Sequence, residues 1–284
     1  MLTRFNIPFG IPRGAGNPPI RLRKKRAFRI ELMKLAAFYL ALYIVLSPAV
    51  AMPVYSWMLF PSDKRVYDTA GPMKQISQVL KVKTDELFFN AQDGAKLHGY
   101  FFHMPGAKKV MLVSHGNGGN IERGFVLYAA LLLCHASVFA YDYLTQQCKV
   151  PAEQIVVYGA SLGTAVSCQI AAQRKVCGIV LQSGFPSLAS TAHHNLFFLR
   201  AYPDRWFDFD QMDNIAVLQK KHAPLLVIHG EDDPILSYAG GLELFQAASP
   251  PKQMLTLKKF GHVVTSFDRQ EFNSAITSFL SSLP

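Results

Sequence analysis

The sequence has few cysteines, and none of them stands at the spacing of a metal site. The four thiols contain no CxxC pair and lie at Cys134, Cys148, Cys168 and Cys177. Because the sequence does not assign disulfide partners, free buried thiols are the simplest expectation. The chain also lacks the period of collagen and the low hydrophobicity of a disordered protein, since 50% of its 284 residues are hydrophobic. We therefore expect one large globular domain with an extension.

Most of the chain also lacks a large net positive charge, although the formal net charge of the whole is +10. Residues 1–34 hold nine basic side chains against the single acid Glu31, which gives a net +8. The remaining 250 residues are close to neutral, at +2. A uniformly basic face on the main domain is therefore excluded, and we expect no nucleic-acid partner.

An uncharged stretch follows this basic block and runs from Leu35 to the residue before Asp63. Roughly 20 apolar residues span the hydrocarbon core of a bilayer, and 32–51 supplies them, with Pro48 and Pro53 near its end. We predict a transmembrane anchor at 32–54. The positive-inside rule then makes 1–31 a basic cytoplasmic tail and places 55–284 on the extracytoplasmic side. A cleaved signal peptide ending at "SPAVA" and a buried core helix are the alternatives.

The pattern changes after about residue 87. "ELFFNAQDGAKLHGYFFHM" predicts a β-hairpin that turns at Asp93 and Gly94. Short apolar runs that end in turn residues follow, with helical segments between most of them, including "KVMLVSHG", "SVFAYDY", "QIVVYG", "GIVLQSG" and "APLLVIHG". This alternation predicts an α/β fold with a mostly parallel sheet and helices on both faces.

Ser161 is the candidate nucleophile. It lies in "YGASLG", between Gly159 and Gly163, directly after a β-branched strand and before an alanine-rich helix. Gly-x-Ser-x-Gly alone is weak evidence, but this strand, turn and helix setting is what a nucleophile elbow requires. The two glycines remove side chains that would collide with the neighbouring strand and helix. The helix that follows adds a partial positive charge that favours an oxyanion.

A catalytic serine needs a base and an orienting acid at the same edge of the sheet. His262 follows the last strand-like run, whereas His115 and His229 stand at strand-to-glycine junctions and are assigned to turns. Among the three acids of "HGEDDPILS", we choose Asp233, because Pro234 biases it towards an extended backbone. The chain order Ser, Asp, His is the one expected for an α/β-hydrolase.

The oxyanion hole is predicted from a glycine-rich turn. In "VSHGNGGN", the N–H of Asn117 can lie beside the N–H of Leu162 and provide two donors. A P-loop is excluded because the GK[ST] ending is absent. The adjacent His193 and His194 have no acidic or cysteine partner at ligand spacing, so we expect no metal.

With these motifs the sequence resembles the serine α/β-hydrolase superfamily. "FPSDK", "DGAKLHGYF", "SHGNGGN", "YGASLG" and "HGEDDPI" are similar to its membrane-anchored bud-emergence branch, which also resembles the ABHD-type acyl-protein thioesterases. The similarity covers about residues 55–284. It implies hydrolysis of esters, thioesters or amides through an acyl-enzyme, without metal or cofactor.

One segment departs from this resemblance. Relatives carry a long helix between the strand equivalent to 138–143 and the nucleophile strand, whereas here only eleven residues, 144–154, connect the two. An extended chain of this length reaches roughly 36 Å, which suffices to cross a third strand but allows almost none of the connection to be helical. We therefore hypothesise that the crossover helix is missing, that one face of the sheet has lost its cover, and that the exposed apolar surface favours association.

An aromatic-rich segment at 185–215 is typical either of a lid over an acyl pocket or of helices packed on the sheet. The sequence thus predicts a membrane-anchored serine hydrolase acting on a lipid-like acyl ester, a thioester or an acylated protein. The alternative is a catalytically silent hydrolase-like binding module weakened by the deletion. Oligomeric state is not decided by the sequence.

Overall fold

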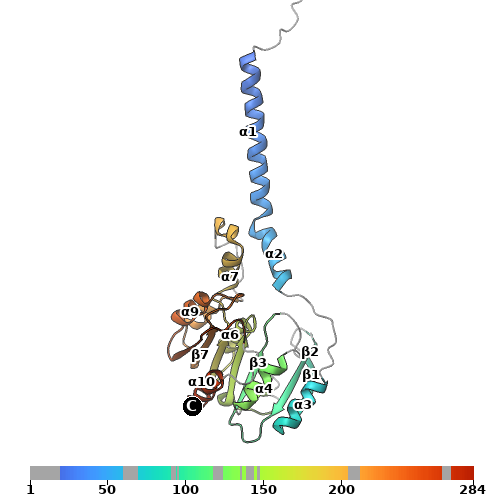
Figure 1. Cartoon of the computed structure of the whole chain (residues 1–284), viewed down its shortest axis with the longest axis vertical. Helices are drawn as coiled ribbons and strands as arrows, with labels where there is room; N and C mark the ends of the chain where they lie inside the picture. The colour runs from blue at the N-terminus through green and yellow to red at the C-terminus, as the bar shows by residue number, and fades with distance from the viewer. Residues whose placement is uncertain are drawn as a thin grey trace, which may run out of the picture.

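A mostly parallel sheet of eight strands forms the centre of the molecule (Figure 1). The computed structural model describes residues 20–59, 70–90, 94, 96–117, 124–134, 136–138, 144–145, 148–203, 212–263 and 270–284. The strand order is β1-β2-β4-β3-β5-β6-β7-β8. β1 and β2 pair antiparallel, β2 also pairs antiparallel with β4, and all other pairs are parallel. The strands are β1 Lys83–Asn90, β2 Lys96–His103, β3 Lys109–Ser114, β4 Ala136–Val138, β5 Ile155–Ala160, β6 Gly178–Gln182, β7 Leu225–Gly230 and β8 Lys252–Leu257.

Helices cover both faces of this sheet. On one side lie α3 Ala70–Leu80, α4 Phe125–Leu133 and α10 Gln270–Ser282. On the other lie α6 Gly163–Gln173, α8 Asn214–Leu218 and α9 Tyr238–Ala247. Side chains of β5 alternate between the two cores, and every residue of β5, β6 and β7 is buried. The predicted α/β class, with a parallel sheet covered on both faces, is confirmed.

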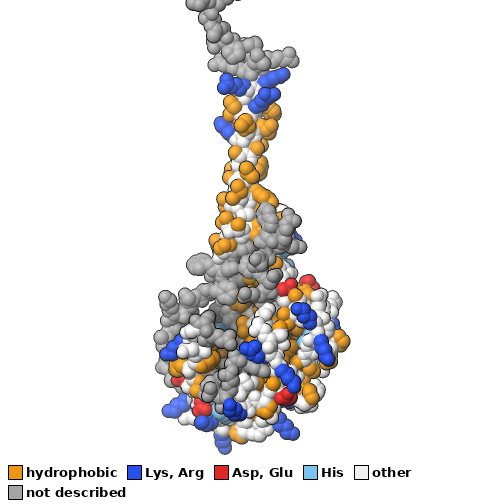
Figure 2. Space-filling model, turned by 180° about the vertical axis from the view of Figure 1, so that it is seen from behind, with side chains coloured by type: hydrophobic (Ala, Val, Ile, Leu, Met, Phe, Trp, Pro, Cys, Tyr) orange, Lys and Arg blue, Asp and Glu red, His pale blue; other side chains and the backbone are white. Residues whose placement is uncertain are grey.

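The predicted transmembrane helix is wrong. The stretch at 32–54 is divided between α1 Ile20–Val45 and α2 Pro48–Leu59, which a break at Leu46 and Ser47 separates. α1 begins inside the basic block, so its apolar part from Leu35 onward is too short to cross a bilayer. Figure 2 shows Lys and Arg gathered at the far end of α1 and apolar side chains along the rest. Among the described residues, no helix combines the length and the apolar content of a membrane span, and the predicted single-pass localisation falls with it.

The N-terminal helices contact the body through α7 Leu188–Asn195 and the 3-10 helix η3 Phe197–Ala201. The ring of Tyr202, which follows η3, stacks on Tyr43 of α1 at 4.6 Å between centroids. Its hydroxyl donates to the Tyr43 carbonyl, and Ala51 of α2 packs on the same small apolar cluster. The end of α1 and the start of α2 are therefore attached to the segment predicted as a lid.

The crossover between β4 and β5 is short, and its described residues pack against the sheet. β4 and β5 flank β3, as the eleven-residue estimate assumed. Leu144 is fully buried, and its carbonyl accepts from the N–H of Val150 at 2.9 Å. The sheet residues on this face, Val110 and Leu112, are also buried. The hypothesis of an uncovered sheet face is therefore wrong for these residues. Most of the predicted strand at 138–143, from residue 139 on, lies outside the described residues.

Candidate active site

Ser161 lies at the tight turn between β5 and α6. Its φ of +53° is in the left-handed region, which residues other than glycine rarely adopt. Its N–H donates to the Gln182 carbonyl at 2.9 Å, which fixes the turn to the end of β6. A Cβ on Gly159 would lie 2.5 Å from the Gly163 carbonyl oxygen, and one on Gly163 would lie 2.0 Å from the Ser114 oxygen. The close approach of strand and helix therefore requires both glycines.

The start of α6 and the loop after β3 both lie next to Ser161. Leu162 is the N-cap of α6, and among the described residues its N–H has no backbone acceptor. The positive end of the α6 dipole is thus directed at the turn. On the other side, a Cβ on Gly116 would lie only 2.9 Å from Ser161 Cβ, so the loop after β3 packs against the serine. Asn117 follows Gly116 and is exposed. Of the two residues predicted for the oxyanion hole, Leu162 directly follows Ser161, and Asn117 directly follows Gly116, which packs against Ser161.

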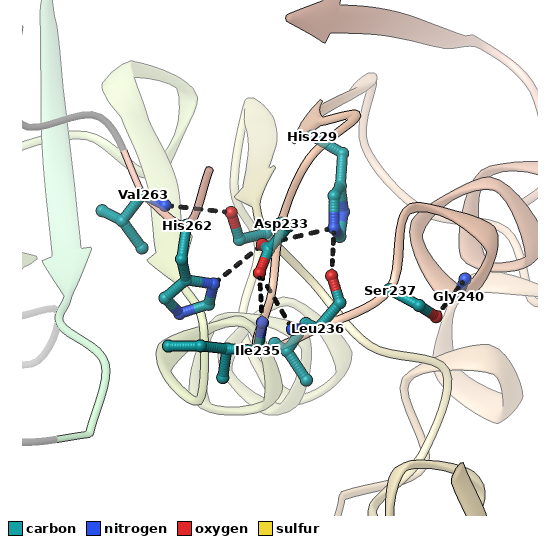
Figure 3. Close-up of polar contacts among 9 residues, drawn as sticks. His229, Asp233, Ile235, Leu236, Ser237, Gly240, His262 and Val263 are labelled. Carbon is teal, nitrogen blue, oxygen red and sulfur yellow. Dashed lines mark hydrogen bonds and ion pairs between the residues drawn. The ribbon is translucent and has the colours of Figure 1, made fainter. Parts of the chain in front are cut away.

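Asp233 and His262 form a hydrogen-bonded pair (Figure 3). His262 Nδ1 donates to Asp233 Oδ2 at 2.8 Å, and Asp233 Oδ1 accepts from the N–H groups of Ile235 and Leu236, both at 2.9 Å. Burial alone would raise the pKa of Asp233, but the hydrogen bonds from His262 and the two backbone groups lower it below its usual value. The carboxylate therefore stays charged and holds the imidazole with Nε2 as its free lone-pair nitrogen.

His229 holds the loop that carries Asp233. This fully buried ring donates from Nε2 to the Leu236 carbonyl at 2.9 Å, and the same nitrogen lies 3.5 Å from Asp233 Oδ2. Burial lowers the pKa of His229, so the ring stays neutral. A Cβ on Gly241 would lie 2.2 Å from its Nδ1, so that glycine makes room for the imidazole. His229 stabilises the turn after β7, as its position at a strand-to-glycine junction predicted, and also fixes the loop of the acid.

Ser161 and His262 are not joined in the same way. Among the described residues, no hydrogen bond links Ser161 Oγ to the imidazole. Sequence reasoning also missed Ser183, whose Oγ accepts from the N–H of Val263 at 3.3 Å. The signal for it was the polar pair in "LQSG", placed directly after the apolar strand β6 and at the same sheet edge as the serine.

A cavity of about 190 Å³ lies next to the acid loop. Its lining combines α7, the start of α9 and Ile235. Ser161 and His262 do not line it. Phe185 and Leu236 line it and also pack in an apolar cluster with Leu162, so they stand between the cavity and the elbow. Among the described residues, no cluster of three or more His, Cys, Asp or Glu could hold a metal ion.

The half of the chain that contains this site matches a known family. The model of the prolyl oligopeptidase family matches residues 137–282, slightly more than half of the chain. The chain belongs to the prolyl oligopeptidase family. This membership places the elbow, the acid and the histidine inside the matched region, and it confirms the predicted resemblance at the level of the α/β-hydrolase superfamily.

The chain is also similar to curated relatives and to solved structures. The chain is 30% identical over 223 residues to an uncharacterized protein of Mycobacterium tuberculosis, covering 69% of this chain and 78% of that protein. It is 26% identical over 186 residues to alpha/beta hydrolase domain-containing protein 17B of Homo sapiens, covering 56% of this chain and 62% of the relative. A Pyrococcus furiosus esterase superposes with a TM-score of 0.59 at 16% identity, over 78% of this chain and 96% of that one. The esterase domain of a Rhodothermus marinus protein gives 0.54 at 17% identity, over 71% and 99%. At such identities the structural matches establish the fold.

Proposed function

We propose that this hydrolase-family chain cleaves an acyl ester or thioester through a covalent acyl-enzyme. Ser161 Oγ attacks the carbonyl carbon, and His262 Nε2 takes the proton and then transfers it to the leaving group. Asp233 holds the imidazole and stabilises the imidazolium that forms. Water then attacks the acyl-enzyme, with His262 again acting as the base, and releases the acid.

The negative charge of the tetrahedral intermediate requires donors that are already in place. The N–H groups of Leu162 and Asn117 are proposed for this role, because one caps α6 without a backbone acceptor and the other follows the loop residue packed on Ser161. The dipole of α6 adds to their effect. No metal or cofactor enters this mechanism.

The pairing of Asp233 with His262 is the observation that supports this proposal most strongly. A buried carboxylate with three donors, one of them imidazole Nδ1, is the arrangement that prepares a histidine to act as a base. The pair lies at the carboxyl edge of the sheet, as does a serine with a left-handed backbone. A structural role would need neither the strained serine nor the free Nε2.

The substrate is proposed to carry an apolar acyl chain, on a lipid-like molecule or an acylated protein. The aromatic-rich segment 185–215, within a hydrolase domain at 55–284, is proposed as the lid. The similarity to alpha/beta hydrolase domain-containing protein 17B supports assignment to the ABHD-type branch of the superfamily. The solved structures named as esterases support ester chemistry, whereas the family name makes peptide amides the competing substrates.

The first experiment is labelling with a fluorophosphonate probe, with wild type compared with Ser161→Ala. We expect the wild type to label and the variant not to label. A panel of acyl esters, acyl thioesters and peptide anilides would then rank the substrate classes. Faster cleavage of anilides than of esters would contradict the proposed substrate.

A catalytically silent binding module is the second candidate. The observation that favours it is the lack of a hydrogen bond from Ser161 Oγ to His262 among the described residues. In that case well-folded wild type would not label, and Ser161→Ala would keep whatever biological activity the protein has. Loss of both labelling and biological activity in Ser161→Ala would exclude this second candidate.

A further inference from the structure

We propose that Ser183 is a positioning residue that sets the location of the His262 loop. The proposal rests on the proposed function and concerns a residue two strands away from the histidine, since Ser183 follows β6 and His262 follows β8. It starts from Val263, the residue that follows the histidine. Val263 has φ +53°, a conformation that is a genuine outlier for a β-branched side chain. A strained residue beside a catalytic group persists only where its surroundings hold it.

The hydroxyl of Ser183 is the group that holds Val263. The N–H of Val263 donates to Ser183 Oγ at 3.3 Å. Ser183 is 1% exposed, so its hydroxyl is shielded from water on the acceptor side of this bond. Ser183 itself has φ +48°, and its N–H donates to the Ile228 carbonyl at 2.8 Å. The strained serine is thus fixed to β7, and the strained valine is fixed to the serine.

The neighbouring residue holds the nucleophile. The carbonyl of Gln182 accepts from the N–H of Ser161 at 2.9 Å. The buried side chain of Gln182 in turn accepts from the Tyr158 hydroxyl of β5. Two successive residues at the end of β6 therefore anchor the nucleophile and the loop of the base separately. The end of β6 thus defines the spacing across which the proton must travel.

Removal of the Ser183 hydroxyl should release this loop. Val263 would then relax towards an ordinary φ, and the backbone that carries His262 would turn with it. The Nδ1 bond to Asp233 would weaken, and Nε2 would move with the ring. A misplacement of about 1 Å costs on the order of 100-fold in rate. The effect should appear in kcat more than in KM, because Ser183 does not touch the substrate.

The test uses Ser183→Ala in the full chain, with Ser249→Ala as the matched control. Ser249 also uses its hydroxyl on a backbone group, the Gln219 carbonyl, but lies between α9 and β8. We expect kcat and the rate of fluorophosphonate labelling per folded molecule to fall by between about 10-fold and 100-fold in Ser183→Ala only. The double variant Ser183→Ala/Val263→Gly should regain most of this loss, because glycine adopts positive φ without strain.

A second readout does not depend on activity. The His262 Nδ1 proton, followed by proton NMR, should be visible in wild type, broadened in Ser183→Ala, and restored in the double variant. If Ser183→Ala does not fold, Ser183→Cys keeps the volume with a weak acceptor and should show the same losses. If the wild type does not label but the three proteins show this series of NMR signals, the proposed function is wrong and the positioning role of Ser183 is supported. An unchanged rate and an unchanged Nδ1 signal in folded Ser183→Ala or Ser183→Cys would overturn the positioning role.

Discussion

The two halves of the sheet differ in how they are built. β5, β6 and β7 are buried along their whole length, whereas β1 alternates between exposed and half-buried residues. The serine, the acid and the histidine follow β5, β7 and β8, and only Asn117 comes from the other half. The short crossover also lies between β4 and β5, where the halves meet. The comparison teaches that the serine and the acid follow fully buried strands and that the histidine follows β8, a partly buried strand of the same half. We therefore expect the pair of acid and base to tolerate changes in the other half.

Removing the charge of the acid should have the largest effect. Asp233→Asn cannot hold the imidazole in the required tautomer, and the corresponding change in serine proteases costs about 10⁴-fold in kcat. The exposed neighbour in Asp232→Asn is the matched control and should retain full activity. Ester hydrolysis with purified variants measures both. Equal activity in Asp233→Asn and Asp232→Asn would show that Asp233 does not act as the acid of the proposed site.

A cavity in the crossover should test whether the halves are independent. Leu144→Ala removes a fully buried side chain, so the free energy of unfolding should fall by about 2–5 kcal/mol. Leu133→Ala changes a side chain that is 46% exposed and should cost much less. Urea denaturation measures both. Labelling of folded Leu144→Ala at the wild-type rate would support the comparison, and a reduced rate would show that the crossover positions the site.

The buried histidine of the acid loop should make stability depend on pH. Because burial lowers the pKa of His229, there is a pH range in which the unfolded chain binds a proton at this residue and the folded chain does not. The stability that His229 contributes is complete above its unfolded pKa of about 6.5 and is lost as the pH falls towards and through the lower folded pKa. In His229→Gln, the drop in melting temperature between pH 7.5 and pH 5 should therefore be smaller. An equal drop would mean that another group causes it.

The smallest effect is expected in the lid-like segment. Ser187 is the N-cap of α7 and accepts from the N–H of Ser190 at 3.0 Å. Ser187→Ala should cost about 1 kcal/mol of stability. Ser187→Asp, which can cap the same N–H, should retain it. Thermal melts of the three proteins provide the measurement, and a loss in Ser187→Asp as large as that in Ser187→Ala would argue against the capping role.

The sequence was sufficient wherever the signal was local. Period, turn residues and the glycines around Ser161 predicted the strands, the elbow and their order along the chain. Pro234 was the only reason to choose Asp233 over its two acidic neighbours. The structure pairs Asp233 with His262. The prediction at 32–54 failed because a run of apolar letters does not reveal where a helix breaks, and here the break at Leu46 and Ser47 divides the run.

What the sequence by itself determined is the fold class, the family motifs and the residues proposed for catalysis, because backbone propensity and hydrophobic pattern act over a few neighbouring residues. Only the tertiary structure decided which groups lie beneath and beside them. Ser183 and Val263 are 80 residues apart, and their bond arises from the parallel pairing that brings the strand ends together, whereas the bond from His229 to Leu236 closes the turn after β7. Contacts between distant residues depend on which strands become neighbours in the sheet, and the pattern of a single segment does not encode that order.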